Sequence, residues 1–173
     1  MIDRRLLAKI TGASALVLAS VMAHEHFAPV ATIPVPNDPP TYAFGSTRKP
    51  DGSPVQLGDK INRSDAKFLL LVQMNEEYLE PLQKCAGDLE LSKGEEAALL
   101  DLAWNIGADK VCKSTMVKKF RAKDYDGGCK AIYLFDRLHG RKCSLPQNRN
   151  RKDGCKGIMN RRDEQYKLCM GGK

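Results

Sequence analysis

Six cysteines constrain this chain more than any other feature of its sequence, because all of them lie in its C-terminal half. None belongs to a CxxC pair, and the chain has only three histidines, so we expect no structural zinc site and no other metal. An even number of cysteines in an exported chain favours three disulfides that stabilise a small fold. The candidate disulfide residues are Cys85, Cys112, Cys129, Cys143, Cys155 and Cys169.

The sequence alone does not fix how these cysteines pair, because six cysteines allow many different sets of disulfides. Proximity along the chain suggests Cys143–Cys155 and Cys112–Cys129. Cys85 is then left to pair with Cys169.

The N-terminus indicates that the chain leaves the cytosol. Arg4 and Arg5 precede a mostly apolar run, residues 6–23, whose single charge is Lys9. Positive charge before an apolar run is typical of an export signal. A stable membrane span needs about 20 strongly apolar residues, whereas this run is diluted by threonine, glycine and serine. Residues 21–23 also suit a signal peptidase, so both a cleaved signal peptide and a membrane helix that is later released remain open.

The rest of the chain divides by composition into an irregular part and a helical part. Residues 24–58 hold seven of the nine prolines, so they predict short strands, at Ala31–Val35 and Thr41–Phe44, and no long helix. From Ser64 onward, apolar residues recur at helical spacing. We expect one helix to begin near Ser64, a second to run from the Ser92 capping box to Gly107, and a third to begin at Ser114 or Thr115. Residues 124–128 lead into a fourth helix, which is closed by Gly140 and holds Ala131, Ile132, Leu134, Phe135 and Leu138. A last helix runs from about Ile158 to Cys169.

The net charge of +7 favours a polyanionic partner such as nucleic acid, anionic lipid or an acidic wall polymer, although solubility explains it equally well. Two basic clusters, residues 149–152 and the pair Arg161-Arg162, have no interleaved aromatic residues, so we expect no nucleic-acid binding. The sequence has no Walker A loop, no GxGxxG and no GxSxG motif, and we therefore expect no cofactor.

Two carboxylates near the apolar run are candidates for acid–base chemistry. Glycoside hydrolysis needs one protonated and one ionised carboxyl group on either side of the scissile bond. Glu25 lies beside apolar residues such as Phe27, which suits the protonated group, and Asp38 lies in a proline-bounded turn, which suits the ionised one. Taken alone, such a pair is weak evidence, because most Glu and Asp residues at this spacing lie at the surface.

Several motifs in the same order strengthen this interpretation. They are His24-Glu25, IPVPNDPPTYAFGST over residues 33–47, AWNIG over residues 103–107, Ser114-Thr115-Met116, and the C-terminal segments Gly128-Cys129, Arg141-Lys142-Cys143, Cys155-x-Gly157-Ile158, Arg161-Arg162 and Leu168-Cys169. In these segments the chain resembles the phage-type lysozymes of glycoside hydrolase family 24, and more closely the signal-arrest-release (SAR) endolysins. The resemblance covers essentially the whole chain.

The resemblance implies a catalytic triad of Glu25, Asp38 and Thr41. Glu25 would protonate the leaving oxygen, Asp38 would hold the attacking water, and Thr41 would hydrogen-bond that water. The resemblance also places Asn105 in the substrate cleft, although a role as a helix-end cap fits its position equally well.

This sequence departs from the usual family pattern at several positions. Relatives commonly have eight residues between the glutamate and the second catalytic residue and five more before the threonine, whereas twelve and two occur here. The usual second position is Pro34, so Asp38 is the nearby carboxylate. Ala43 and Ser46 stand where some relatives have glycine and histidine.

The fold and organisation implied are an α+β, predominantly α-helical, lysozyme-like domain with a small β-containing N-terminal lobe. Residues 1–23 would form a signal-anchor-release segment and residues 24–173 the muramidase domain. We expect a monomer that uses the host export machinery. It would face the periplasm from the inner membrane, held by residues 6–23, and then become soluble in the periplasm.

The activity implied is hydrolysis of the β-1,4 bond between N-acetylmuramic acid and N-acetylglucosamine in peptidoglycan, silent while the chain is tethered and active on release. Two alternatives remain: a lytic transglycosylase with the same substrate, and a membrane-tethered wall-binding protein without catalysis.

Overall fold

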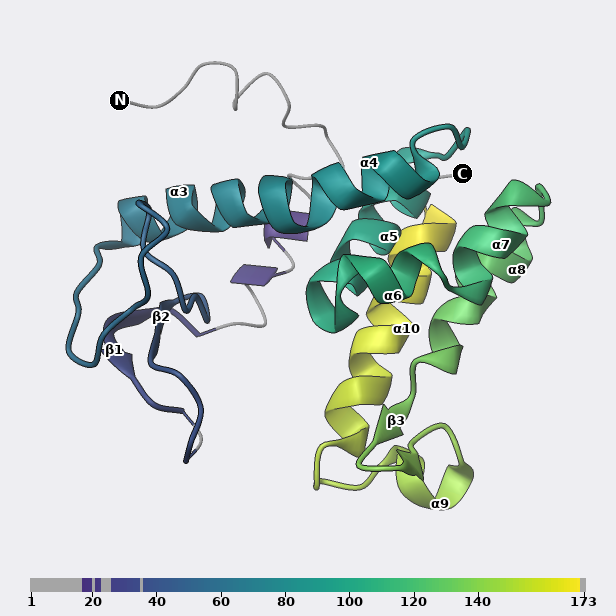
Figure 1. Cartoon of the computed structure of the whole chain (residues 1–173). Helices are drawn as coiled ribbons and strands as arrows, with labels where there is room; N and C mark the ends of the chain where they lie inside the picture. The colour runs from purple at the N-terminus through teal and green to yellow at the C-terminus, as the bar shows by residue number, and fades with distance from the viewer. Residues whose placement is uncertain (1–16, 20, 23–25, 35, 172–173) are drawn as a thin grey trace. The chain divides into compact units, whose positions relative to one another are not determined.

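The computed structural model describes residues 17–19, 21–22, 26–34 and 36–171. The chain forms two compact units, Met1–Glu77 and Tyr78–Lys173. Among its described residues from 26 onward, the first unit holds a small sheet and a helix, and the second unit is mostly helical (Figure 1). The predicted α+β organisation, mostly helical with a small sheet near the N-terminus, is therefore confirmed. Glu25 and most of the predicted anchor lie outside the described residues, and the domain boundary after residue 23 stays a prediction.

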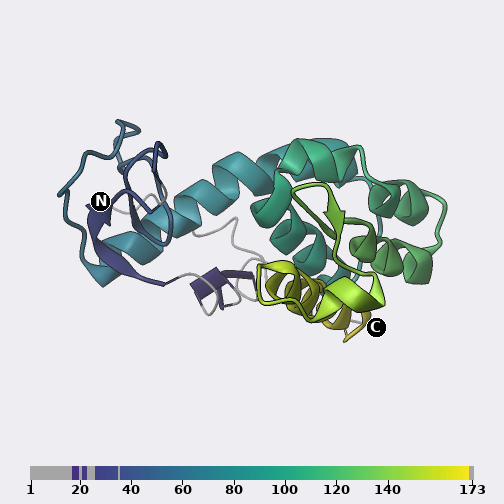
Figure 2. The same cartoon turned by 90° about the horizontal axis from the view of Figure 1, so that it is seen from below.

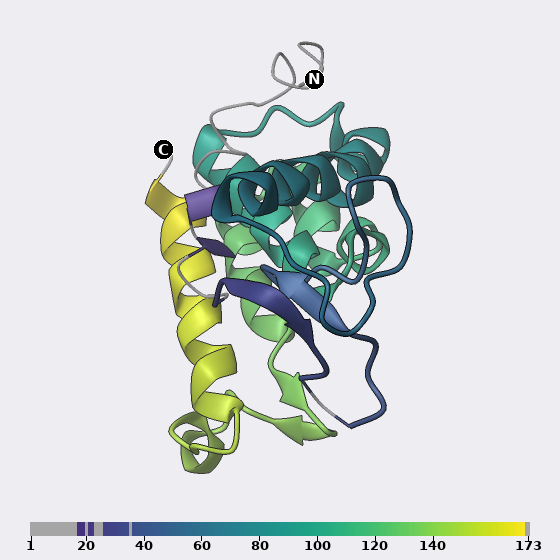
Figure 3. The ribbon, with the colours of Figure 1, turned by 90° about the vertical axis from the view of Figure 1, so that its left-hand side faces the viewer.

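The sheet of the first unit pairs β1 (Ala28–Thr32) with β2 (Thr41–Ala43) in antiparallel register, with Thr32 opposite Thr41 (Figure 3). Strand β2 begins where the sequence predicted, whereas β1 begins three residues earlier than expected and ends before Pro34. Proline has no backbone N–H, so it cannot extend the ladder. The other edge of β1 is also paired, because Ala31 donates its N–H to the Asp59 carbonyl oxygen at 2.8 Å.

Helix α3 (Arg63–Gln73) packs its buried Leu69 and Leu70 side chains into the first unit and contacts β2. Its N-cap is Asn62, two residues before the predicted start at Ser64, because the Asn62 side chain accepts a hydrogen bond from the Asp65 N–H at 2.9 Å. The helix continues through a π-helical segment, η1 (Met74–Leu79), into α4 (Glu80–Ala86).

The second unit is built around α5 (Lys93–Ile106) and α10 (Cys155–Gly171), which pack against each other (Figure 2). The predicted capping box is confirmed, since Ser92 and Glu95 exchange side-chain and backbone hydrogen bonds. Gly107 ends α5 with a φ of +92°, a conformation that favours glycine. Shorter helices complete the unit: α6 (Ala108–Cys112), α7 (Thr115–Arg121) and α8 (Tyr125–Lys130).

The prediction of a helix that holds residues 131–138 and ends at Gly140 is wrong. After α8 the chain makes a short 3-10 turn, η2 (Ala131–Leu134), and then a hairpin of β3 (Arg137–Leu138) and β4 (Arg141–Lys142). The hairpin turns at His139 and Gly140, both with positive φ, a combination that is typical of type I′ two-residue loops. A last short helix, α9 (Pro146–Arg149), follows.

A buried aspartate explains why the helix stops there. Asp136 is 2% exposed, and its carboxylate accepts the Ser144 N–H at 3.2 Å. Its carbonyl oxygen accepts the Cys143 N–H at 2.7 Å. The chain must reverse direction to make these two bonds, and a continuous helix would leave the carboxylate buried without them.

Three disulfides join all six cysteines, as predicted, and the Cys143–Cys155 pair is confirmed. The other two predicted pairs are wrong: Cys85 is bonded to Cys112, and Cys129 is bonded to Cys169. The pairing follows helix packing rather than separation along the chain, because α4 packs on α6 and α8 packs on α10.

Part of the predicted anchor segment is described. Residues 17–19 and 21–22 are helical, and Val17 and Val21 have no exposed surface. Within the described part of the chain, no helix is long and apolar enough to cross a membrane.

Candidate active site

The loop between β1 and β2 carries the candidate Asp38. Residues 36–38 form its turn, where Asn37 adopts a φ of +74° that asparagine tolerates better than most residues. Asp38 is exposed to solvent and is followed by two prolines that fix the backbone leading into β2. The turn therefore leaves this carboxylate in contact with solvent.

Thr41 is the first residue of β2 and is half-buried. Strand β2 is short because the chain turns immediately after it: the Tyr42 carbonyl oxygen accepts the N–H groups of Gly45 and Ser46 at 3.0 and 2.9 Å. Ala43 has a φ of +56°, a left-handed conformation that favours glycine. Asp38 and Thr41 thus lie on one continuous loop-and-strand segment.

A buried serine fixes this turn to α3. Ser46 is 6% exposed, and its hydroxyl accepts a hydrogen bond from the Gln73 side-chain amide at 2.8 Å. The same hydroxyl donates to the Arg48 carbonyl oxygen at 2.7 Å. Ser46 therefore ties the turn after β2 to helix α3, a role that the sequence did not predict.

An open groove of about 680 Å³ lies elsewhere on the first unit. The Lys49 ammonium and the Asp59 carboxylate form an ion pair of 2.9 Å at its wall. The Gln56 N–H and Lys49 lower the pKa of Asp59, whereas burial and the Asp59 charge raise the pKa of the Tyr42 phenol. Neither Asp38 nor Thr41 lines the groove, so it is not the predicted catalytic site.

Asn105 lies in the second unit, near the end of α5, and its side chain is exposed. Its Oδ1 accepts a hydrogen bond from the guanidinium of Arg162 on α10. The end of α5 is closed by the Gly107 N–H, which donates to the Ala103 carbonyl oxygen at 2.7 Å. The Asn105 side chain is therefore oriented by α10, and the observed backbone bond, rather than this side chain, closes the helix.

Arg162 organises a buried polar network that was not predicted from the sequence. Its guanidinium is 3% exposed and also donates to the Phe135 carbonyl oxygen at 2.8 Å and to Gln165. Gln165 in turn donates to the buried carboxylate of Asp101 on α5 at 2.5 Å. Burial lowers the pKa of Arg162 to about 10, so the guanidinium remains charged at neutral pH.

The signal for this network was present in the sequence. Arg162 and Gln165 are three residues apart, and Asp101 and Asn105 are four apart, so each pair shares one face of its helix. A polar pair on a core-facing stripe predicts a buried partner opposite. Among the described residues, no group of three or more His, Cys, Asp or Glu side chains is arranged to hold a metal ion.

Comparison with protein families finds a match to the phage lysozyme model over residues 24–165. The SAR-endolysin of Escherichia phage N15 is 29% identical over 119 residues, which cover 68% of this chain and 65% of that protein. The SAR-endolysin of Escherichia phage 933W is 29% identical over 133 residues, which cover 76% of this chain and 71% of that protein.

Two solved structures show the same fold. The endolysin of Escherichia coli O157:H7 phage FAHEc1 superposes with a TM-score of 0.74 at 23% identity, covering 92% of this chain and 94% of that one. A P22 lysozyme variant superposes with a TM-score of 0.73 at 20% identity, covering 93% and 99%. The second unit and the β1–β2 sheet therefore belong to a lysozyme-like fold.

Proposed function

The chain belongs to the phage lysozyme family, and we propose that it is a phage endolysin that hydrolyses host peptidoglycan. The observation that carries the proposal is the family match over residues 24–165, which include Glu25, Asp38 and Thr41. The resemblance to phage-type lysozymes and SAR endolysins inferred from the motifs agrees with this match and with the relatives that carry that name.

The proposed reaction cleaves the β-1,4 bond between N-acetylmuramic acid and N-acetylglucosamine. Glu25 gives its proton to the leaving glycosidic oxygen. Water adds to the anomeric carbon and passes a proton to Asp38, while Thr41 hydrogen-bonds the water. Inversion at that carbon requires carboxyl groups about 6.5–9.5 Å apart, a gap that admits the water.

Two features of the described residues support these roles. The exposed position of Asp38 leaves its carboxylate free to hold water, and the turn after Thr41 is fixed to α3 through Ser46 and Gln73. The Oδ1 atom of Asn105 already accepts a hydrogen bond from Arg162. The NH₂ group of Asn105 is therefore the part that would donate to a sugar or acetamido oxygen.

A lysis assay tests the catalytic roles. Turbidity of chloroform-treated Gram-negative cells is followed with the wild-type protein, Glu25→Gln, Asp38→Asn and the control Glu90→Gln, an exposed glutamate in the second unit. We expect the first two variants to lose about 100-fold or more in rate and the control to lose none. Full activity of Glu25→Gln would remove its role as the acid, and full activity of Asp38→Asn would remove its role in holding water.

We further propose that residues 6–23 hold the enzyme inactive in the inner membrane, facing the periplasm, until release. Glu25 lies two residues beyond Ala23, so insertion of the segment keeps Glu25 at the bilayer surface. The burial of Val17 and Val21 supports a form in which this segment packs on the folded protein. The segment has no cysteine, so release does not work through thiol exchange within it.

The double variant Gly12→Leu with Ser14→Leu tests the release. It raises the stability of the inserted helix by roughly 1 kcal/mol or more, so we expect more protein in the membrane fraction and later lysis. Unchanged timing would contradict the release model. If the mature protein is found cut after Ala23, the segment is a cleaved signal peptide and the release model fails. The catalytic proposal is unaffected by that result.

A further inference from the structure

Most of the net charge of this chain lies in one short segment, which we name the basic loop, residues 137–156. Seven of its twenty residues are Lys or Arg and one is acidic, a formal charge of +6 in a chain whose net charge is +7. Composition alone attributes such an excess to solubility, but a solubilising charge does not need to gather in one place. The loop comprises the β3–β4 hairpin, α9 and the first two residues of α10.

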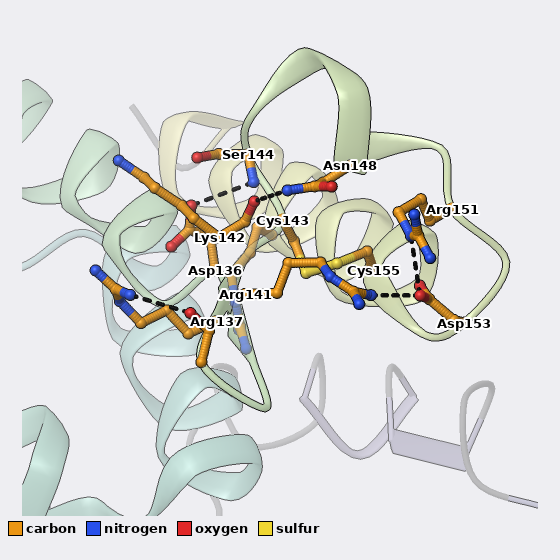
Figure 4. Close-up of a disulfide and its surroundings, with 12 residues drawn as sticks. Asp136, Arg137, Arg141, Lys142, Cys143, Ser144, Asn148, Arg151, Asp153 and Cys155 are labelled. Atoms are coloured by element: carbon orange, nitrogen blue, oxygen red, sulfur yellow. Dashed lines mark hydrogen bonds and ion pairs between the residues drawn. A yellow bond between two sulfur atoms is a disulfide. The ribbon is translucent and has the colours of Figure 1, made fainter.

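The loop is held in a fixed conformation (Figure 4). The Cys143–Cys155 disulfide joins its two halves, and both cysteines are fully buried with Met159. The Asn148 side-chain amide donates to the Lys142 carbonyl oxygen at 2.9 Å, which ties α9 to β4. Because the backbone is already ordered, binding a partner would cost little further conformational entropy.

The carboxylates near the loop compensate only part of its charge. Asp153 contacts the guanidinium groups of both Arg141 and Arg151 (Figure 4). Arg149 pairs with Asp163 on α10 at 2.7 Å. The remaining cations are exposed and, among the described residues, have no acidic partner within ion-pair distance: Arg137, Lys142, Lys152 and Lys156.

Exposed leucines accompany these cations. Leu134 is 61% exposed just before the loop, and Leu145 is 40% exposed within it. They flank the contact between Asp136 and Ser144, which brings the two chain segments together. The loop contains no Phe, Tyr or Trp, so it lacks the side chains on which single-stranded nucleic-acid bases stack.

We propose that the basic loop docks the protein on a bilayer surface rich in anionic phospholipid. Cations beside exposed aliphatic side chains match the two layers of such a surface, the phosphate headgroups and the acyl chains beneath them. This proposal rests on one part of the proposed function, namely that the chain is released beside the inner membrane. After release, the loop would keep the enzyme at the membrane face rather than free in the periplasm.

A vesicle-binding experiment tests this docking in the full chain. The probe variant is Lys142→Gln, Lys152→Gln, Lys156→Gln, and the matched control is Lys84→Gln, Lys110→Gln, Lys118→Gln, three exposed lysines of the same unit. Cosedimentation is measured with vesicles of phosphatidylcholine plus phosphatidylglycerol and with phosphatidylcholine alone, at low and high salt. Residues 6–23 are identical in all variants, so the comparison between variants isolates the loop.

Each cation near an anionic surface contributes about fivefold to binding, so the loop variant should lose on the order of 100-fold with phosphatidylglycerol vesicles. If binding followed net charge alone, the two triple variants would bind equally, because each loses three positive charges. The proposal therefore requires the control to bind at least 10-fold more tightly than the loop variant. Equal loss in the two variants, or wild-type binding that is the same without phosphatidylglycerol, would overturn the proposal. Tighter wild-type binding to duplex DNA than to the anionic vesicles at the same salt would overturn it in favour of nucleic acid.

Hydrolysis of purified, lipid-free peptidoglycan separates this proposal from the enzymatic one. The loop variant should hydrolyse it at the wild-type rate while losing vesicle binding. A parallel loss of binding to the purified peptidoglycan would assign the loop to the wall polymer and overturn the lipid docking. If even the wild type hydrolysed nothing, the proposed function would fail, and the vesicle result would still stand on its own.

Discussion

The disulfide between Cys129 and Cys169 should contribute more to stability than the one between Cys143 and Cys155. It joins residues 40 positions apart, against 12 for the other pair, and all four cysteines are fully buried. Restricting the unfolded chain by these loops corresponds to about 4 kcal/mol for the longer loop and about 3 kcal/mol for the shorter. Replacing Cys129 and Cys169 together by alanine should therefore lower Tm by about 8–16 °C.

Urea denaturation of the two double-alanine variants measures this difference, with the Cys143/Cys155 variant as the matched control. Peptide mapping of the single variant Cys169→Ala adds a direct test, because the thiol released should be that of Cys129. A free thiol at Cys85 instead would restore the pairing predicted from sequence proximity. A loss below about 1 kcal/mol in the Cys129/Cys169 variant would refute the loop-closure reasoning.

Three further predictions follow from contacts within each unit. Burial and the hydrogen bond to Asp163 raise the pKa of Tyr133 to about 12 from an ordinary 10.0, so the contribution of Tyr133 to stability is complete below pH 10 and is lost as pH rises towards 12. Ultraviolet titration of the wild type should show one phenol that ionises near pH 12 and is absent from Tyr133→Phe, and the lack of such a phenol would contradict the contact. Ser46→Ala leaves the Gln73 amide without this acceptor and should cost about 1–3 kcal/mol in urea denaturation, whereas a neutral result would show that the turn holds without it. Arg162→Met should cost about 3–5 kcal/mol by the same assay, and no loss would mean that the buried network does not hold α10 on α5.

The sequence predicted the elements whose signals are local. The Ser92 capping box, the glycine stop at Gly107 and the start of a helix after Ser114 each depend on a few adjacent residues, and each is present in the structure. The number of disulfides was predictable for the same reason, because it needs only the cysteine count and the export signal. The position of β2 followed from the prolines before it and the turn after it.

The failures concern contacts between residues far apart in the sequence. Two disulfides were paired wrongly because sequence proximity carries no information on which helices pack together. The hairpin at His139 was mistaken for helix because its cause, the burial of Asp136 beneath Ser144, is a tertiary contact. Arg162 was grouped with surface cations for the same reason, although it is buried against α5.

The most direct test of the central claim, that this chain is a hydrolase of the glycan strand, is mass spectrometry of the fragments it releases from purified peptidoglycan. We expect disaccharide fragments that end in a reducing N-acetylmuramic acid, formed by the wild type and absent with Glu25→Gln. Fragments that end in 1,6-anhydro-N-acetylmuramic acid would instead identify a lytic transglycosylase, and equal release by Glu25→Gln would contradict the account.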